Sequence, residues 1–438
     1  MTSALDSGST AWLLTSCALV LLMAPGLAFF YGGMVRSKSV LNMMMMVFGA
    51  LAVVMVVWVV VGFSIAFGDD LGGGLVGDPS QYFGFKDMLE ADPEAVYPIT
   101  AFAIFQGLFA VITVALIAGS IAERTKFGTW LIFAGLWTVL VYAPIAHWIF
   151  DFSAGDHVGG WMANNLKALD FAGGTAVEIN SGAAGLAVAL VLGKRIGFGR
   201  EPMKPHNLTL VMVGCGLLWF GWFGFNAGSA LAANNLAAVV FANTLLAGCT
   251  GMLSWLLVER LRDGHATSFG AASGVVAGLV AITPSCGSVT PIGAMVIGVA
   301  AGAICAMAVG LKYKLGYDDS LDVVGVHLVG GLVGTIGIGF LACATVQGSI
   351  DGLLYGGGTD QLGRQLVAAG ATFAFSFGVT YVLALVLEKT IGFRVEGDDE
   401  MAGVDLVEHA ETAYDLTPTT GGARPHIAGG TGTLLDKD

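Results

Sequence analysis

The sequence predicts an all-α integral membrane protein with eleven transmembrane helices, arranged as a 5+5 inverted repeat plus an eleventh helix. Hydrophobic residues make up 55% of its 438 residues and charged residues only 12%, whereas charged residues are about a quarter of a soluble domain. The apolar runs are about 20 residues long, as membrane-spanning helices require, and lack the alternating segments of about 10 that mark outer-membrane barrels. The 65 glycines favour closely packed and interrupted helices.

Apolar runs mark the predicted spans in order. No basic residue precedes the first run, so the N-terminus lacks the charged region of a signal peptide, and we expect this run to be retained as a helix. The chain becomes polar after about residue 394, which predicts a transmembrane domain at 1–393 and a tail at 394–438. The spans are expected at about 11–32, 42–67, 99–121, 129–150, 172–193, 207–230, 236–258, 269–284, 291–313, 322–343 and 365–391.

Basic residues lie mostly on one side of these spans. Only Lys86, Lys167 and Arg364 fall on the other side, where the loop at 68–98 is acidic. Because basic loops stay in the cytoplasm, we expect an extracytoplasmic N-terminus, a cytoplasmic tail and a location in the cell membrane. The net charge of −13 adds at most a mild attraction for cations. The fourteen residues on the basic side are Arg36, Lys38, Arg124, Lys126, Lys194, Arg195, Arg200, Lys204, Arg260, Arg262, Lys312, Lys314, Lys389 and Arg394.

Two ionisable residues lie in the middle of apolar spans. Glu178 follows Asp170 by eight positions in the fifth span, and His327 follows Asp319 by eight in the tenth. Because each half has five spans, the second half enters from the opposite side, which is the inverted topology of many transporters. Charges at this depth usually face a partner or a pathway, although a satisfied core residue is the alternative. The pair could pass a proton, and the aspartates are expected to cap their helices or to support a cation site.

Aromatic residues gather on two helix faces. Phe105 and Phe109 lie four residues apart in the third span and therefore share a face. Ring faces attract a cation and a hydroxyl accepts a hydrogen bond, so such a face suits a partly dehydrated cation, with packing or lipid-facing aromatics as the alternative. The sixth span places four residues at i, i+3, i+4 and i+7: Trp222, Phe225, Asn226 and Ser229.

Other chemistry is not indicated. The sequence has no nucleotide-binding loop, no Ser/His/Asp set and no cluster of metal ligands, so we expect no enzyme activity, no cofactor, no metal and no nucleic-acid partner. The six scattered cysteines predict no disulfide framework. His147 and His157, at and beyond the end of the fourth span, are expected to be solvated surface residues.

The chain resembles the ammonium transporter family (Amt/Mep/Rh), and within it the Amt branch, from about Trp12 to Tyr414. The resemblance implies transport of ammonium or methylammonium, a homotrimer in a lipid membrane with one pore in each subunit, and a trimeric P-II type nitrogen regulator as partner of the tail at Gly397 to Asp415. The segments that carry it are PGLAFFYGGMVRSKSVLNMM, FQGLFAVITVALIAGSIAER, LDFAGGTAVEINSG, WFGWFGFNAGSA, GLVAITPSCG, DDSLDVVGVHLVGG and VEGDDEMAGVDLVEHAETAYD.

A recruitment site and a gate follow from the resemblance. Phe109 and Phe225 would be the stacked rings that gate the pore, and Asp170 would support the entrance electrostatically. Asn226 and Thr283 fall in family segments near the pathway and are expected to line the pore. Ammonium would first be held by ring faces and a hydroxyl at Phe105, Phe109, Trp222 and Ser229.

Two departures from the family pattern stand out. The usual pore motif has two histidines, and here Glu178 replaces the first while His327 retains the second, a Glu/His variant that resembles some fungal members. The segment AHWIFDFSAGDHVGGWM has a longer loop than is typical, and Phe150 replaces the tryptophan expected three positions after His147. Either Phe150 or Trp161 could complete the recruitment site, and the preserved register favours Phe150.

The sequence therefore predicts an electrogenic ammonium transporter. It would recruit ammonium at an aromatic site, deprotonate it near the gate and conduct ammonia, with proton co-transfer assisted by Glu178 and His327. An ammonium sensor that signals through the cytoplasmic tail to a P-II type partner is the alternative. Sensor fusions usually carry an extra signalling domain, which the roughly 25 residues after Tyr414 are too few to encode.

Overall fold

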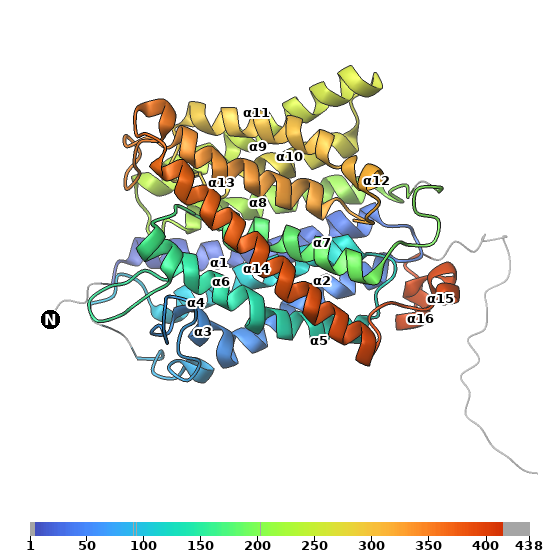
Figure 1. Ribbon diagram of the computed structural model, residues 1–438, viewed down its shortest axis with the longest axis horizontal. Coiled ribbons are helices and arrows are strands. Elements are labelled where there is room, and N and C mark those ends of the chain that lie inside the picture. Colours follow the sequence, from blue (N-terminus) through green and yellow to red (C-terminus); the bar gives the residue numbers. More distant parts are fainter. Residues whose placement is uncertain (1–4, 91, 93, 202, 415–438) are drawn as a thin grey trace, which may run out of the picture.

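The protein is a bundle of long helices that run roughly parallel to one another (Figure 1). The computed structural model describes residues 5–90, 92, 94–201 and 203–414, so the predicted tail at 394–438 is described only to Tyr414. In this part of the chain, ten helical segments are long and apolar enough to cross a membrane, and α10 (Ser268–Ile282) is a shorter apolar helix at the predicted eighth span. The eleven predicted spans are confirmed.

Several spans of the first half are interrupted by π-helical turns. Such turns leave the regular hydrogen-bond ladder and often mark functional positions. The elements are α1 (Ser7–Met34), α2 (Val40–Val57) joined through η1 (Trp58–Gly62) to α3 (Phe63–Phe67), α4 (Ile99–Ala118) ending in η3 (Gly119–Ile121), α5 (Phe127–Trp137) joined through η4 (Thr138–Tyr142) to α6 (Ala143–Phe150), and η6 (Gly174–Ile179) leading into α7 (Asn180–Leu192).

The second half repeats this order, and one further long helix follows it. Short turns η2 (Phe83–Phe85), η5 (Met162–Leu166) and η8 (Leu353–Tyr355) lie in connecting loops. The elements are α8 (Leu208–Gly228), α9 (Asn235–Asp263), α10, α11 (Pro291–Ala308) with α12 (Leu311–Leu315), η7 (Val324–Leu328) leading into α13 (Val329–Leu341), and α14 (Asp360–Thr390), followed by α15 (Gly397–Ala402) and α16 (Val404–His409).

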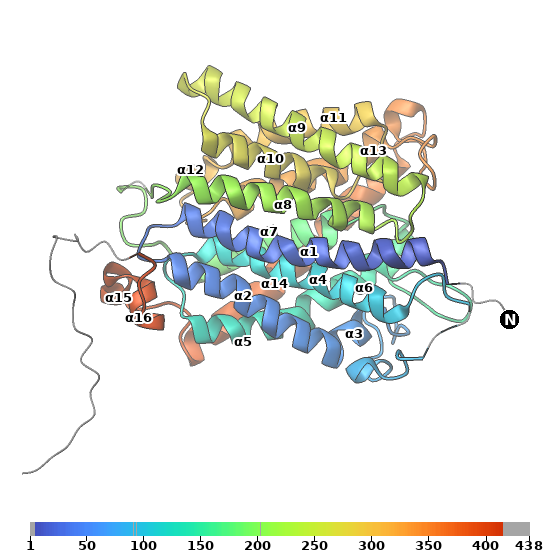
Figure 2. The same ribbon diagram turned by 180° about the vertical axis from the view of Figure 1, so that it is seen from behind.

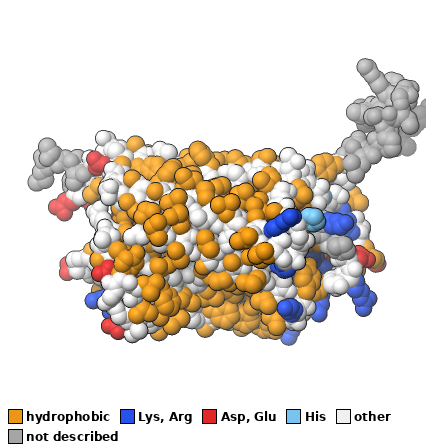
Figure 3. All heavy atoms as spheres, turned by 90° about the horizontal axis from the view of Figure 1, so that it is seen from above, with side chains coloured by type: hydrophobic (Ala, Val, Ile, Leu, Met, Phe, Trp, Pro, Cys, Tyr) orange, Lys and Arg blue, Asp and Glu red, His pale blue; other side chains and the backbone are white. Residues whose placement is uncertain are grey.

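The bundle has two ends of different charge. Its broad side is covered by hydrophobic side chains, and Lys and Arg side chains gather mostly toward one end (Figure 3). We call this the basic end; α1 ends there, and α15 and α16 pack against it (Figures 1 and 2). The opposite end, where α1 begins and the loop at 68–98 lies, is the acidic end. The apolar belt between two polar ends is that of a multi-pass membrane protein.

The fifth and tenth spans start alike but from opposite ends of the bundle. Each opens with a π-helical segment, η6 or η7, and continues as a helix of 13 residues. Asp170 accepts a hydrogen bond from the backbone N–H of Gly174 at 2.7 Å, and Asp319 accepts one from that of Val324 at 2.7 Å. The predicted capping role of both aspartates is confirmed, because the N–H groups of a first helical turn lack partners within the helix.

Glycines let these two spans cross in contact. Gly182 lies four residues after Glu178, and Gly331 lies four after His327. A Cβ on Gly182 would lie 2.4 Å from the backbone N of Leu328, and a Cβ on Gly331 would lie 2.8 Å from the Cβ of Glu178. Only glycine permits backbones this close. The contacts are reciprocal, and each glycine lies four residues along the chain from an ionisable residue, which supports the predicted inverted repeat.

Helix α14 lies outside the repeat and forms hydrogen bonds with both the fifth and the tenth span. It crosses the bundle diagonally over α7 (Figure 1). Gln365 accepts a hydrogen bond from the N–H of Leu169 and donates to the carbonyl oxygens of Leu169 and Thr335. Ser376 donates to the carbonyl oxygen of Asn180 at 2.8 Å. The eleventh helix thus fixes the backbone on both sides of the central crossing.

Candidate functional site

A vestibule of about 550 Å³ is sunk into the acidic end. Its wall contains three of the predicted substrate-binding residues, Phe109, Phe150 and Ser229, together with Asp170. Aromatic rings, whose faces attract cations, are the largest group in the wall, which also contains aliphatic and polar side chains. The other aromatic residues in it are Phe63, Phe67, Tyr82, Tyr97, Phe102, Phe152 and Phe171.

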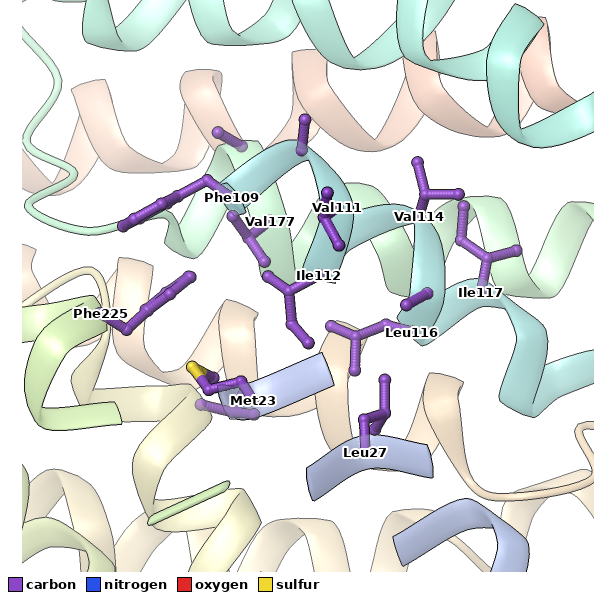
Figure 4. Packing of buried hydrophobic residues seen from close by; sticks show 14 of the residues in the cluster. Met23, Leu27, Phe109, Val111, Ile112, Val114, Leu116, Ile117, Val177 and Phe225 are labelled. Atoms are coloured by element: carbon purple, nitrogen blue, oxygen red, sulfur yellow. The ribbon is translucent and has the colours of Figure 1, made fainter. Parts of the chain in front are cut away.

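Two stacked rings close the floor of the vestibule. Phe109 of α4 and Phe225 of α8 lie with ring centroids 4.0 Å apart and planes 10° from parallel (Figure 4). Phe150 meets Phe109 edge-on at 6.4 Å, whereas Phe105 lies behind Phe109 at 4.9 Å and is fully buried. Phe105 therefore supports the ring of Phe109 and does not line the vestibule itself.

Ser229 and Gln106 bring uncharged polar acceptors to the vestibule wall. Ser229 donates its hydroxyl hydrogen to the carbonyl oxygen of Phe225 at 2.8 Å, which leaves the lone pairs of its oxygen free to accept. Gln106 also lines the vestibule, and its side-chain oxygen is buried without a hydrogen-bond partner among the described residues. Sequence reasoning missed Gln106, although a single amide within an apolar span could have been recognised by the argument that selected Glu178.

A second, inner cavity lies behind the stacked rings. Glu178 and His327 meet in its wall, with 2.7 Å between the Glu178 carboxylate oxygen Oε2 and the His327 ring nitrogen Nδ1. Both side chains are buried, and most of the other lining residues are apolar. Figure 4 shows how several of these apolar residues pack, among them Met23, Ile112 and Val177. The other lining residues are Met23, Leu27, Phe30, Tyr31, Ile112, Leu116, Val177, Leu218, Trp222, Phe225 and Val276.

The contact between Glu178 and His327 suits proton transfer. When Glu178 is ionised it can only accept a hydrogen bond, and Nδ1 of His327 then carries the hydrogen and donates it to Glu178. The other ring nitrogen, Nε2, then has a free lone pair that can accept a proton. An acid and an imidazole in hydrogen-bond contact form a relay with two protonation sites in one dry cavity.

The remaining predicted residues of the sixth span lie at different depths. Trp222 lines the inner cavity and is absent from the vestibule wall that holds Ser229, because seven residues of helix separate them by about 10 Å. Its indole nitrogen donates to the Thr283 hydroxyl at 2.8 Å, so Thr283 orients Trp222 from outside the cavity wall. Asn226 donates to Thr244 at 3.1 Å and faces α9, so it does not line either cavity.

Phe150, the last residue of α6, lies in the vestibule wall, whereas Trp161 in the following segment does not. Trp161 packs against Trp148, with ring centroids 5.9 Å apart. The prediction that His147 is solvated is wrong: the side chain is fully buried, with Nδ1 3.2 Å from the carbonyl oxygen of Ala66. Its position at the end of a span suggested exposure, but the folded loops on both sides cover it.

Comparison with known proteins gives the family. A sequence profile described as Ammonium Transporter Family matches residues 11–414. The chain belongs to the ammonium transporter family. A protein of Mycobacterium tuberculosis named ammonium transporter is 56% identical over 444 residues, covering 96% of this chain and 93% of that protein. The crystal structure of Saccharomyces cerevisiae Mep2 has a TM-score of 0.83 at 36% identity, covering 90% of this chain and 88% of that one.

A structure titled Sensor Amt Protein is also similar, with a TM-score of 0.84 at 28% identity, covering 92% of this chain and 98% of that one. The ammonium transporter family consists of multi-pass membrane transporters rather than enzymes, in agreement with the sequence prediction. This chain is thus a helical membrane protein of the ammonium transporter family, and its two cavities lie on opposite sides of the stacked rings.

Proposed function

We propose that ammonium enters at the acidic end and is first held in the vestibule by Phe109, Phe150 and Ser229. Ring faces replace part of the hydration shell of the cation, and the Ser229 oxygen accepts one of its hydrogen bonds. Phe105 backs the ring of Phe109, and Asp170 adds negative charge at the entrance while it caps η6. This dehydration sets selectivity, because potassium cannot donate hydrogen bonds or give up a proton.

The stacked rings of Phe109 and Phe225 then act as a gate that an uncharged molecule passes more easily than an ion. Ammonium loses its proton near this gate and continues as ammonia through the apolar inner cavity. Glu178 and His327 accept and forward the proton, so that charge crosses the membrane together with ammonia. The observation that carries the proposal is the 2.7 Å contact of these two groups directly behind the rings.

The sidedness of the protein follows from its charges. The basic end faces the cytoplasm of a cell membrane, with the N-terminus outside and the tail from residue 394 inside. The transmembrane domain is the part before residue 394. A homotrimer with one pore in each subunit and a P-II type regulator at the cytoplasmic face agree with the family and stay proposals for this chain.

A sensing role is the second candidate, favoured by the docking of the tail. The Asp405 carboxylate accepts the backbone N–H of Asn42 at 2.7 Å, and that of Glu408 accepts the N–H of Phe127 at 2.8 Å. The tail therefore caps the starts of α2 and α5, and α2 packs against α4, which lines both cavities, so a shift of α4 would reach a partner bound to the tail through α2. The similarity to a sensor Amt protein also favours this candidate.

Currents in proteoliposomes test the proposal. An ammonium gradient across membranes with the purified protein should drive a current, which should vanish in protein-free liposomes. Transport of labelled methylammonium without any current would refute the coupled proton step and favour neutral ammonia conduction. Ammonium binding without uptake of either substrate would favour the sensor.

A further inference from the structure

The longer loop after α6 places a histidine between two carboxylates at the edge of the vestibule. Ring nitrogen Nδ1 of His157 lies 2.6 Å from the Asp69 carboxylate, and Nε2 lies 2.9 Å from that of Asp151. Asp151 and His157 belong to the vestibule wall, whereas the side chain of Asp69 is 60% exposed at the surface. The chain of contacts from Asp151 through His157 to Asp69 thus joins the substrate entrance to bulk solvent at the acidic end.

Hydrogen bonding fixes the charge of His157 in this arrangement. Ionised carboxylates only accept hydrogen bonds, so both ring nitrogens must donate, and only the imidazolium has two N–H groups. Two carboxylates and one imidazolium carry a net charge of −1, which becomes −2 when His157 loses its proton. The vestibule therefore has a wall whose charge depends on one histidine.

Asp151 has unused capacity for a cation. Its side chain is 6% exposed, and its oxygen Oδ2 has no hydrogen bond among the described residues. The nearest group is Nδ1 of buried His147 at 3.2 Å, while Asp70 lies 3.4 Å from the other nitrogen of His147. Within the described residues, no set of side chains in this cluster is arranged to hold a metal ion. Because Oδ2 is itself shielded from solvent, Asp151 would attract a cation in the vestibule through its charge and not through a bond to this oxygen.

We propose that Asp151 is a further recruiting residue for ammonium and that the His157 imidazolium neutralises the charge of Asp151. Capture of ammonium then strengthens when the imidazolium loses its proton, because Asp151 is no longer neutralised. This inference rests on the proposed entry of ammonium through the vestibule. It adds a residue that positions the cation before it meets the rings.

The direction of the pH effect follows from the contacts of His157. Partial burial lowers its pKa, but the hydrogen bonds to Asp151 and Asp69 outweigh burial, so the pKa is raised above the ordinary value. The bridge is therefore intact at low pH and is lost as the pH rises through this raised pKa. The other titratable groups around the bridge are Asp70 and His147, which lie behind Asp151, and Tyr82. Burial and the charges of Asp69 and Asp151 raise the pKa of Tyr82, so its hydroxyl stays protonated across the range in which histidines titrate.

The test measures methylammonium uptake in proteoliposomes from about pH 5 to about pH 8.5, where histidines titrate and methylammonium stays protonated. In the unaltered protein, the KM should fall about three- to tenfold as the pH rises, because this is the effect expected of one additional charge contact that is screened by solvent. The maximal rate should change little. His157→Gln should give the low KM at every pH, and Asp151→Asn the high one. Asp69→Asn, at the exposed side, should move the step to lower pH.

A matched control removes a charge elsewhere at the same end. Asp87 has a 75% exposed side chain and does not line the vestibule, so Asp87→Asn should keep the KM step of the unaltered protein. An unchanged pH step in His157→Gln, or equal effects of Asp151→Asn and Asp87→Asn, would overturn the inference while transport itself persists. Absence of uptake by the unaltered protein would instead overturn the proposed function, and this inference with it.

Discussion

Replacing Glu178 by glutamine tests the proton step with the least change in shape. Glutamine keeps the side-chain length, so the close contact between the Glu178 Cβ and Gly331 is preserved. Its side-chain oxygen can still accept the hydrogen bond that His327 donates over 2.7 Å. The substitution removes only the negative charge and the ability to take up a proton. We expect the ammonium-driven current to fall while the protein folds normally.

The size of the loss follows from the contact. A buried hydrogen bond to a charged group contributes about 1.5–3 kcal/mol, and a neutral one about half of that or less. The carboxylate also stabilises an imidazolium formed on His327 during transfer. If only the difference, about 0.75–1.5 kcal/mol, is lost from the transition state, the current falls at least about 3- to 12-fold, because each 1.4 kcal/mol is a factor of ten.

Currents after rapid ammonium jumps on proteoliposomes provide the assay, normalised to the amount of reconstituted protein. Glu259→Gln is a matched control, because Glu259 is a buried carboxylate that binds Trp255 and Thr267 at the basic end of α9, away from both cavities. Glu178→His would restore two imidazoles and should retain more current than Glu178→Gln. A current in Glu178→Gln equal to that of the unaltered protein would remove Glu178 from the mechanism.

Three further substitutions probe the parts that hold the site. Thr283→Val should cost about 1–3 kcal/mol in thermal unfolding and slow uptake, because the Trp222 N–H loses its buried acceptor; unchanged stability would contradict this. Gly182→Val should abolish uptake because its Cβ would meet the backbone of the tenth span, whereas Gly216→Val, with open space around it, should not. Asp170→Asn should lower the free energy of unfolding by about 1–2 kcal/mol and raise the KM for methylammonium. If the stability changes and the KM does not, the role of Asp170 is helix capping alone.

Most of the fold could be predicted from the sequence because the membrane simplifies the problem. Every backbone polar group must be satisfied within the span, so apolar length alone located all eleven helices. The equal spacing from Asp170 to Glu178 and from Asp319 to His327 indicated the repeat. The π-helical openings of those spans were not predicted, because they depend on how aspartate side chains replace backbone partners, which no apolar pattern encodes.

The site was predicted less completely than the fold. The stacking of Phe109 with Phe225 and the meeting of Glu178 with His327 were foreseen, because the family resemblance supplied the pairs. Face periodicity failed for Trp222, because residues on one helix face can lie about 10 Å apart in depth. Burial by distant loops, as at His147, also has no signal in local sequence.

The inverted repeat explains why the identity of Glu178 matters so much. The reciprocal glycine contacts make the two pore positions equivalent in backbone terms, so the backbone does not decide which side chain donates the hydrogen bond. Two imidazoles could exchange donor and acceptor roles, whereas an ionised carboxylate can only accept, so His327 is the donor whenever Glu178 is ionised. The pair then carries a negative charge that two neutral imidazoles lack. Under the proposed mechanism, we therefore expect a proton that arrives through the gate to be held more strongly here than between two imidazoles, and its release toward the basic end to be slower.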